Sequence, residues 1–286
     1  MDLTIIIVSW NVREALERNL ACLFLLSDVV TRDVVVIDNH STDGTAAMVR
    51  EQFKDVSLIE NDWNAGFAFA VNQGIRLSRG RSILLLNPDM LVREGSLDRV
   101  VERLQSRNDI GVLGARLESR DGNVVPSVRR DPSLTDQLAI ALKLPHVFPS
   151  VLARYTIKDF DCSRSQNVEQ VRGSFFAFRR DVIELVGLFD EGFFLWFEEV
   201  DFCRRVREAG FQVHFASDVI AEDLVGRSFA QVSTRRKQWM FTKSQRRYFK
   251  KWHGWWAYLL LLAATPLALC AGVLEDARRV LIGKHV

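Results

Sequence analysis

Short apolar segments of strand length alternate with longer segments of helical spacing through the first 115 residues, and this alternation restricts the fold more than any other feature. The strand-length runs, rich in β-branched residues, occupy 3–8, 33–38, 56–60, 82–86 and 110–115. Helical spacing of apolar residues is found in 14–26, 43–53, 66–79 and 95–107. Alternation of this kind indicates βαβ units. We therefore expect an α/β fold, with a doubly wound, mostly parallel sheet and helices on both of its faces.

Length and composition favour one large domain with a smaller appendage. A chain of 286 residues can bury a sizeable core, and a net charge of +2 gives no indication of a nucleic-acid partner. The four cysteines have neither disulfide-framework nor metal-site spacing, which predicts a reducing compartment. Residues 1–9 have no basic region, and their apolar run is too short for a signal peptide, so we expect the bulk of the protein to stay in the cytosol.

Periodicity weakens between about 120 and 170, where four prolines (Pro126, Pro132, Pro145 and Pro149) interrupt the chain. We expect loops and short helices here, lying over the functional face as a lid or an acceptor platform. Strand and helix patterning returns in 171–222.

The C-terminal region has a different character. Residues 235–251 contain eight Lys or Arg and no acidic residue, and 255–274 is a run of twenty residues without a charge. A run of that length is about what a helix needs to cross a bilayer, and the aromatic residues at its start, Trp252, Trp255, Trp256 and Tyr258, resemble an interfacial belt. We predict membrane association through 235–274. A spanning helix, a re-entrant or in-plane helix and a buried core helix all remain open.

Polar residues follow the predicted strands, at the edge where ligands of parallel sheets bind. They are Ser9-Trp10-Asn11, the run from Asp38 to Gly44, and Asn87-Pro88-Asp89. Asp38 at a strand end is suited to accept hydrogen bonds from a base or ribose, although turn and helix-cap chemistry explains the same run equally well. Asp89 is a partial site for Mg²⁺ or Mn²⁺, with a simple Pro-Asp turn as the alternative.

Two further segments carry polar groups. Asn64 and Gly66 stand at a predicted helix start, where Asn64 caps the helix and Gly66 permits close backbone approach. Glu198, Glu199 and Asp201 fall within four positions among aromatic residues. On a helix over 196–209, Glu198 and Asp201 share a face and Glu199 points elsewhere. Acids at the positive end of an ordinary helix would give the same pattern.

Five sequence blocks, in this order, resemble the family 2 glycosyltransferases of the GT-A fold, and bacterial rhamnosyltransferases in particular. The blocks are I-I-V-S-W-N at 6–11, D-N-H-S-T-D-G-T at 38–45, N-A-G-F-A-F-A-V-N-Q-G at 64–74, L-L-N-P-D at 85–89 and G-L-F-D-E-G-F-F-L-W-F-E-E-V-D-F-C-R-R at 187–205. The resemblance implies a catalytic domain over 1–228. Its donor-binding half would cover about 1–115 and its acceptor half about 116–228. Residues 229–286 would form the membrane-associating segment.

The resemblance also implies residue roles. Asp38 would contact the base or ribose of a nucleotide-sugar donor, and the same pocket would be shaped by Ser9, Asn11, Asn64, Gly66 and Asn87. Asp89 would hold a divalent cation, Mg²⁺ or Mn²⁺, on the donor diphosphate. Asp223 stands where relatives usually carry a metal-binding histidine. Glu199 would be the catalytic base in place of the commoner aspartate, with Glu198 and Asp201 orienting it or the acceptor. The acceptor site would be formed by Gly173, Ser174 and Trp196.

These roles predict an inverting transfer of a sugar from a dTDP- or UDP-linked donor to a lipid-linked or glycan acceptor. Rhamnose is the favoured sugar, and the expected location is the cytoplasmic face of the inner membrane. Two alternatives stay open. A sugar-1-phosphate nucleotidyltransferase would need a Gly-rich phosphate loop after the first strand, which Ser9-Trp10-Asn11 does not provide. A membrane-tethered nucleotide-sugar binder would leave the Glu-Glu-x-Asp cluster unexplained.

Overall fold

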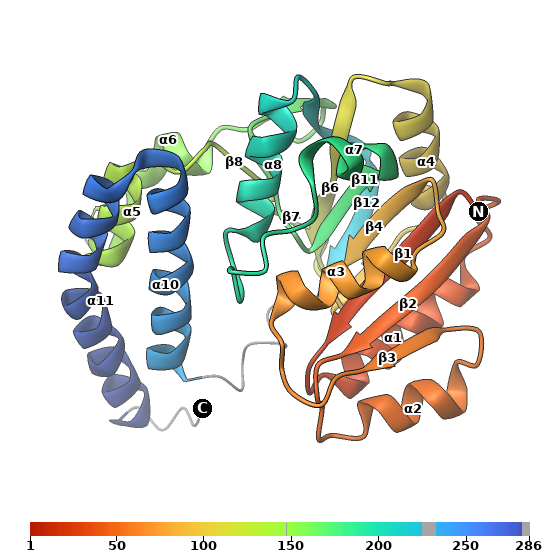
Figure 1. Cartoon of the computed structure of the whole chain (residues 1–286), viewed down its shortest axis with the longest axis horizontal. Helices are drawn as coiled ribbons and strands as arrows, with labels where there is room; N and C mark the ends of the chain where they lie inside the picture. The colour runs from red at the N-terminus through yellow and green to blue at the C-terminus, as the bar shows by residue number, and fades with distance from the viewer. Residues whose placement is uncertain (147, 225–232, 282–286) are drawn as a thin grey trace.

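The computed structural model describes residues 1–146, 148–224 and 233–281, with the side chains of 146, 149 and 271–281 outside the description. Its centre is a ten-stranded sheet in the order β3-β2-β1-β4-β11-β6-β12-β5, with β7 and β9 paired to β6 and β12 (Figure 1). These strands are β1 (Leu3–Ser9), β2 (Arg32–Asp38), β3 (Ser57–Glu60), β4 (Ser82–Leu86), β5 (Met90–Val92), β6 (Ile110–Ser119), β7 (Val124–Val125), β9 (Gln166–Val168), β11 (Phe175–Arg179) and β12 (Gln212–Asp223). A separate small sheet pairs β8 (Val128–Arg129) with β10 (Gln170–Val171).

The helices lie between these strands and after them. They are α1 (Arg13–Leu25), α2 (Thr45–Gln52), α3 (Phe67–Leu77), α4 (Ser96–Ser106), α5 (Leu134–Ala141), α6 (Ala153–Thr156), α7 (Arg180–Val186), α8 (Glu198–Glu208), α10 (Thr234–His253) and α11 (Trp255–Leu281). Two short 3₁₀ helices, Leu144–His146 and Pro149–Leu152, lie in the proline-rich region where loops and short helices were predicted.

The sheet is mostly parallel in its main body, as predicted. β1 pairs in parallel with β2 and with β4, β2 pairs in parallel with β3, and β6 pairs in parallel with β12. The antiparallel strand β11 joins the two parallel groups by pairing with β4 and with β6. The five predicted strands correspond to β1, β2, β3, β4 and β6. The carboxyl ends of β1, β2 and β4 therefore meet at one edge of the sheet.

Helices cover both faces, because successive strand residues point to opposite sides. Ile5 of β1 belongs to a core cluster that includes Leu20 of α1 and Val100 of α4. Its neighbour Ile6 belongs to a second cluster that includes Val71 of α3 and Phe202 of α8. This division confirms the expected sheet with helices on both faces.

Helices α10 and α11 form a hairpin beside the sheet, next to α5 (Figure 1). Gly254 turns the chain between them with a φ of +87°. A third apolar cluster joins the hairpin to the segment before α8, packing Phe193 and Phe197 against Tyr248 and Leu261. The predicted domain boundary at 228/229 lies outside the described residues.

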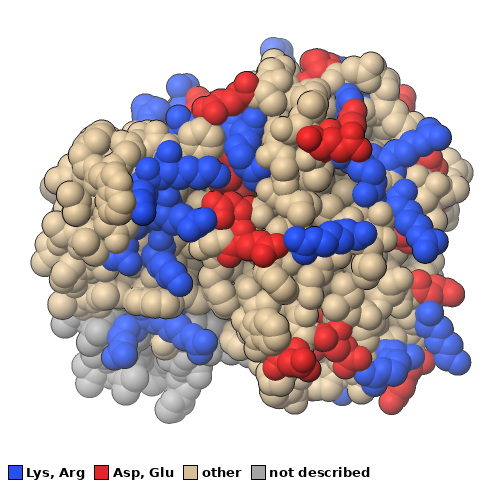
Figure 2. All heavy atoms as spheres, in the orientation of Figure 1, with Lys and Arg blue, Asp and Glu red and all other residues tan. Residues whose placement is uncertain are grey.

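One face of α11 is packed and the other is exposed. Ala257, Leu261, Ala264 and Ala268 are buried. Among the side chains described on this helix, those of 255–270, the large exposed ones are apolar: Trp255, Trp256, Leu259, Leu260, Leu262 and Leu267. In Figure 2 the flank at α11 is largely uncharged, while Lys and Arg side chains gather over α10. The helix is thus not enclosed in a core.

No helix in the described part of the chain combines the length and apolarity needed to cross a membrane. Membrane association through 235–274 stays a prediction.

Candidate active site

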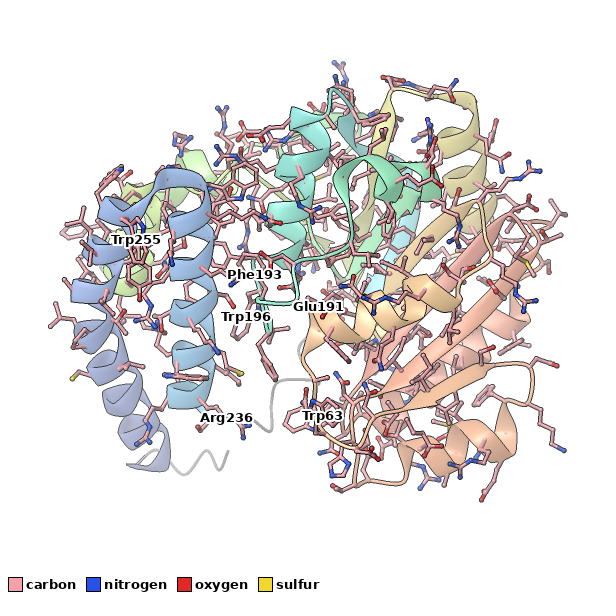
Figure 3. All side chains as sticks on the ribbon, viewed as in Figure 1. Trp63, Glu191, Phe193, Trp196, Arg236 and Trp255 are labelled. Atoms are coloured by element: carbon pink, nitrogen blue, oxygen red, sulfur yellow. The ribbon has the colours of Figure 1, made fainter. Side chains whose placement is uncertain are left out.

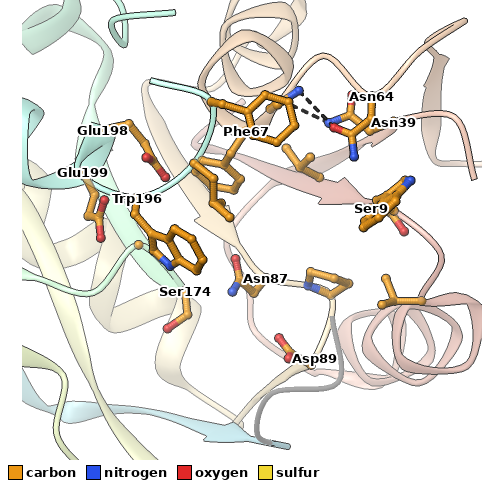
Figure 4. A pocket seen from close by; sticks show the side chains of 18 of the residues that line it. Ser9, Asn39, Asn64, Phe67, Asn87, Asp89, Ser174, Trp196, Glu198 and Glu199 are labelled. Carbon is orange, nitrogen blue, oxygen red and sulfur yellow. Dashed lines mark hydrogen bonds between the residues drawn. The ribbon is translucent and has the colours of Figure 1, made fainter. Parts of the chain in front are cut away.

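A cavity opens at the sheet edge where β1 and β4 end, and it is closed by the starts of α3, α8 and α10. Eleven sequence-predicted residues line it: Ser9, Asn64, Gly66, Asn87, Asp89, Gly173, Ser174, Trp196, Glu198, Glu199 and Asp223. Figure 4 shows Glu198 and Glu199 on one side and Ser9, Asn39 and Asn64 on the other, with Asn87 and Asp89 between them. The site therefore has two chemically different sides.

Three predicted residues do not line the cavity. The first two, Asn11 and Asp38, organise the loops after β1 and β2. Asn11 adopts a φ of +52° and accepts a hydrogen bond from the backbone N–H of Thr42 at 2.7 Å. Asp38 accepts one from the backbone N–H of Ser41 at 2.9 Å through Oδ2. Its Oδ1 is buried with no hydrogen-bond partner in the described structure. Asp38 is paired with Ser9 across the two parallel strands, so it lies directly behind the cavity wall.

The start of α3 is held by a close backbone approach. Gly66 has a φ of +85°, and a β-carbon there would lie 2.7 Å from the carbonyl oxygen of Phe194. That same carbonyl accepts a 2.7 Å hydrogen bond from the backbone N–H of Phe67. Asn39 adds a hydrogen bond from its side-chain amide to the Gly66 carbonyl at 3.1 Å. Only glycine meets both requirements at position 66, which confirms the close approach that the sequence predicted.

A buried asparagine shapes the turn that presents Asp89. The side-chain amide of Asn19, on α1, donates to the carbonyls of Asn87 and Met90 at 3.2 and 2.5 Å. The backbone N–H of Asn87 donates to the Ser174 carbonyl at 2.9 Å. Asp89 is thereby fixed between β4 and β5 with its side chain almost fully buried at the cavity wall.

Asp89 and Asp223 reach the cavity from adjacent chain segments. Asp223, at the end of β12, pairs with Met90 of β5, and the Leu224 backbone N–H donates to the Asp89 carbonyl at 3.0 Å. The Asp223 carboxylate accepts a 3.0 Å charge-assisted hydrogen bond from Arg172. In the described residues, no cluster of three or more His, Cys, Asp or Glu side chains suited to a metal is present. Two carboxylates nevertheless fit Mg²⁺ or Mn²⁺, which usually take their other ligands from phosphate oxygens and water.

The segment before α8 is strained. Trp196 and Phe197, both non-glycine residues, adopt φ values of +63° and +71°. Such conformations cost about 1–3 kcal/mol each and persist where the surroundings fix them. Here the Leu195 carbonyl accepts a 2.7 Å hydrogen bond from the Ser244 hydroxyl on α10, and the Phe197 ring packs against Tyr248. After this double left-handed turn α8 begins at the cavity, with Glu198 and Glu199 in its first turn.

Glu198 and Glu199 both place a carboxyl group in a buried position, where the charged form loses its hydration. Each has an Oε2 that is buried with no hydrogen-bond partner in the described structure. Burial, reinforced by the neighbouring charge of Glu199, raises the pKa of Glu198 well above its usual range. Burial also raises the pKa of Glu199, but backbone N–H groups and the positive charges of Arg129 and Arg172 oppose that rise. Glu199 is therefore the one favoured to carry the negative charge.

Asp201 is the third predicted residue outside the cavity. Its fully buried carboxylate accepts hydrogen bonds from Arg205 at 2.9 Å and from Trp252 at 2.8 Å, and it pairs with Lys251 at 2.7 Å. Glu198 and Asp201 stand three residues apart on α8, as predicted, but only Glu198 lines the cavity, and the expected site role of Asp201 beside Glu199 has no counterpart there. Glu198 and Glu199 face the cavity together, because the helix begins at Glu198 and α10 captures Asp201.

Several lining residues have no role that was predicted from the sequence, among them Asn39, Arg172, Arg236 and Met240. Asn39 and Arg172 adjoin predicted residues and could have been found by extending those motifs. Arg236 and Met240 belong to α10, which the sequence placed outside the catalytic domain. Only tertiary packing brings α10 to the cavity.

Comparisons with known proteins agree with this geometry. A family model described as "Glycosyltransferase like family 2" matches residues 2–242. An N-acetylglucosaminyl-diphospho-decaprenol L-rhamnosyltransferase from Mycobacterium tuberculosis is 29% identical over 220 residues, covering 73% of this chain and 71% of that protein. A low-salt glycan biosynthesis hexosyltransferase from Haloferax volcanii is 27% identical over 216 residues, covering 74% of this chain and 64% of the relative.

Among solved structures, a mannosyltransferase from Pyrobaculum calidifontis in complex with GDP-Man and Mn²⁺ superposes with a TM-score of 0.59. It is 20% identical, and the match covers 98% of this chain and 75% of that one. At this level of identity the similarity establishes the fold alone.

Proposed function

This chain belongs to glycosyltransferase-like family 2, and on that premise we propose that it moves a sugar from a nucleoside-diphosphate donor to a hydroxyl of a lipid-linked or glycan acceptor, with inversion at the anomeric carbon. Membership confirms the family resemblance and the expectation of a glycosyltransferase. It also favours transfer over the nucleotidyltransferase and over the non-catalytic binder. L-Rhamnose is the sugar we favour, because a rhamnosyltransferase is among the relatives.

The observation that carries the proposal is the pair of glutamates facing the strand-end pocket across one cavity. In an inverting transfer the acceptor hydroxyl attacks from the side opposite the leaving diphosphate, so its base must stand apart from the donor phosphates. Glu199 meets that requirement and is the glutamate that nearby cations favour in its charged form. We assign it the role of general base.

Glu198 takes a different role. Because burial raises its pKa, the Glu198 carboxyl group is suited to donate a hydrogen bond to a sugar hydroxyl. Gly173 lies against Glu199, since a β-carbon at Gly173 would be 3.6 Å from the Glu199 side chain. The buried hydroxyl of Ser174 has no partner in the described structure. We propose that Gly173, Ser174 and the Trp196 ring form the acceptor side.

The donor lies at the opposite side. Ser9, Asn64, Gly66 and Asn87 line the cavity there, and the hydroxyl of Ser9 is buried with no partner in the described part of the chain. Asp38, paired with Ser9 on the neighbouring strand, has an equally unpartnered carboxylate oxygen, which is suited to accept a hydrogen bond from a base or ribose group. We propose a dTDP- or UDP-linked donor, while the loop role of Asn11 is structural.

Asp89 and Asp223, which both line the cavity, would hold Mg²⁺ or Mn²⁺. A bound cation would neutralise charge on the leaving diphosphate. Arg172, hydrogen-bonded to Asp223, adds a fixed positive charge on the same side. The Mn²⁺ in the mannosyltransferase complex supports this proposal.

We further propose that the enzyme works at the cytoplasmic face of the inner membrane, in cell-surface glycan synthesis. The apolar outer face of α11 and the basic residues of α10 would contact the bilayer in an in-plane arrangement. The named substrate of the mycobacterial relative is itself lipid-linked, which supports an acceptor of that class.

The test is transfer by purified protein with a panel of dTDP-, UDP- and GDP-sugars, with GlcNAc-diphospho-polyprenol as acceptor. We expect release of nucleoside diphosphate from one donor, dependent on Mg²⁺ or Mn²⁺. Asp89→Asn should abolish the metal response, while Asp109→Asn, on the far end of the sheet, should keep it. Binding of a nucleotide sugar without turnover on any acceptor would contradict the proposal.

A further inference from the structure

We infer that the first turn of α10 forms the subsite for the diphosphate of a polyprenyl-diphosphate-linked acceptor. Arg236 would bind the diphosphate, and Trp239 would contact the first isoprenoid units. The inference deepens the proposed function, on which it rests for the chemistry of the acceptor. It assigns a binding role to a helix that lies outside the predicted catalytic domain.

The first observation is that Arg236 belongs to two hollows at once. It lines the active cavity together with Met240, the residue one turn further along α10. It also lines a surface groove with Ser233, Arg235, Trp239 and Leu269. The Arg236 side chain therefore borders both the groove and the cavity that contains the two glutamates.

The second observation is the chemistry of that groove. Arg235 and Arg236 provide guanidinium groups, which bind phosphate oxygens with two parallel hydrogen bonds. Trp239 is about half exposed, and Leu269 of α11 lies across from it. A ligand that fits both properties has a diphosphate at one end and a hydrocarbon chain at the other.

The third observation is the direction in which the groove leads. Because α10 and α11 are antiparallel, the start of α10 lies beside the later part of α11, close to Leu269. Leu267, Leu262 and Leu259 continue an exposed apolar face along α11. Figure 3 shows Arg236 at the foot of α10, facing the gap between the hairpin and the sheet domain, with Trp196 above it. A lipid on α11 would thus place its diphosphate at Arg236 and its sugar toward Trp196 and Glu199.

The donor diphosphate is the competing ligand for Arg236, since it carries the same phosphate chemistry. The strand-end side of the cavity, with Ser9, Asn39 and Asn64, lies opposite the glutamates. The groove, by contrast, is formed entirely by the helical hairpin. Because Arg236 reaches the cavity from the hairpin side, we assign it to the acceptor, and the dTDP and UDP titrations below test the donor as the alternative ligand.

The experiment measures binding and needs no turnover. Farnesyl diphosphate, farnesyl monophosphate and farnesol are titrated by calorimetry into the full-length protein, and dTDP and UDP are titrated as donor-site probes. The variants are Arg236→Gln and Trp239→Ala. The matched control is Arg18→Gln, which removes an exposed arginine on α1 far from the hairpin.

We expect the wild type and Arg18→Gln to prefer farnesyl diphosphate over farnesol. Arg236→Gln should weaken farnesyl diphosphate roughly 10- to 100-fold, the effect of losing a charge-assisted hydrogen bond, and leave farnesol unchanged. Trp239→Ala should weaken both prenyl compounds and keep the preference. Affinity for dTDP and UDP should not change in Arg236→Gln.

Two results would overturn the inference. Equal affinity of Arg236→Gln and wild type for farnesyl diphosphate would show that Arg236 does not bind the diphosphate. Loss of dTDP or UDP affinity in Arg236→Gln, with prenyl binding intact, would assign the residue to the donor. Because neither result depends on transfer, failure of the inference is distinguishable from failure of the proposed enzyme activity.

Discussion

Substitution of Asp201 by asparagine separates a structural role from a chemical one. The Asp201 carboxylate is fully buried and joins α8 to α10 through Arg205, Lys251 and Trp252. Removing one partner of a buried ion pair typically costs 3–5 kcal/mol, because the other charge stays behind without compensation. Asp201→Asn keeps a hydrogen-bond acceptor for Trp252 but loses the charge.

The size of the effect follows from what the two cations retain. Arg205 still donates to the carbonyls of Val186, Gly187 and Leu188, and the Lys251 side chain is 35% exposed. We therefore expect the lower end of the range, about 3 kcal/mol of unfolding free energy. In a chain of this size that corresponds to a fall in Tm of roughly 5–10 °C.

Thermal unfolding by circular dichroism measures the loss, and transferase activity is assayed well below the lowered Tm. The control is Asp109→Asn, which breaks an exposed pair with Arg107 and should cost less than about 1 kcal/mol. We expect Asp201→Asn to keep kcat within roughly tenfold of wild type, since Asp201 does not face the cavity. A variant with wild-type Tm and abolished turnover would refute this reasoning.

Three further predictions concern the cavity. Because burial raises the pKa of Glu199, kcat/KM should fall with decreasing pH, and the fall should begin at a higher pH than an ordinary glutamate would give. Arg129→Gln removes a positive charge that stabilises the Glu199 carboxylate, so it should move the acidic limb of the kcat/KM profile to still higher pH. Glu198→Gln should raise Tm at pH 7.5, because the raised pKa of Glu198 in the folded state makes the native protein less stable as pH rises from the usual glutamate pKa through the folded-state pKa. The gain in Tm should disappear as pH falls to the usual glutamate pKa. An unchanged Tm at pH 7.5 would contradict the burial argument. Gly66→Ala should cost about 1–3 kcal/mol in denaturant unfolding and weaken donor binding, since its β-carbon would meet the Phe194 carbonyl, and full stability would show that the loop yields.

Local pattern was sufficient for five strands of the sheet, β1, β2, β3, β4 and β6, and for the cavity residues at the ends of β1 and β4. Strands such as Ser82–Leu86 are buried on both faces, so their sequences are continuous apolar runs that stand out from the helices around them. The strands without such a run were not predicted individually. Met90–Val92 and Gln166–Val168 are three residues each and exist only because β12 supplies their partners.

Helical periodicity predicted the carboxylate cluster but not its orientation. It placed Glu198 and Asp201 on one face of the helix. In the structure Glu198 and Glu199 line the cavity, whereas Asp201 pairs with Lys251 and accepts a hydrogen bond from Trp252. The cause is tertiary packing. The left-handed turn at Trp196 sets where the helix starts, and α10 supplies partners more than forty residues away in sequence. The role of α10 as a cavity wall was hidden for the same reason.

The most direct test of the assigned chemistry is the turnover of Glu199→Gln at saturating donor and acceptor, measured together with donor affinity. A general base contributes roughly 10²- to 10⁴-fold, so turnover should fall by at least about 100-fold. Donor affinity should stay within about threefold of wild type, because Glu199 stands on the side of the cavity away from Ser9 and Asn64. Turnover within about tenfold of wild type would show that another group removes the acceptor proton.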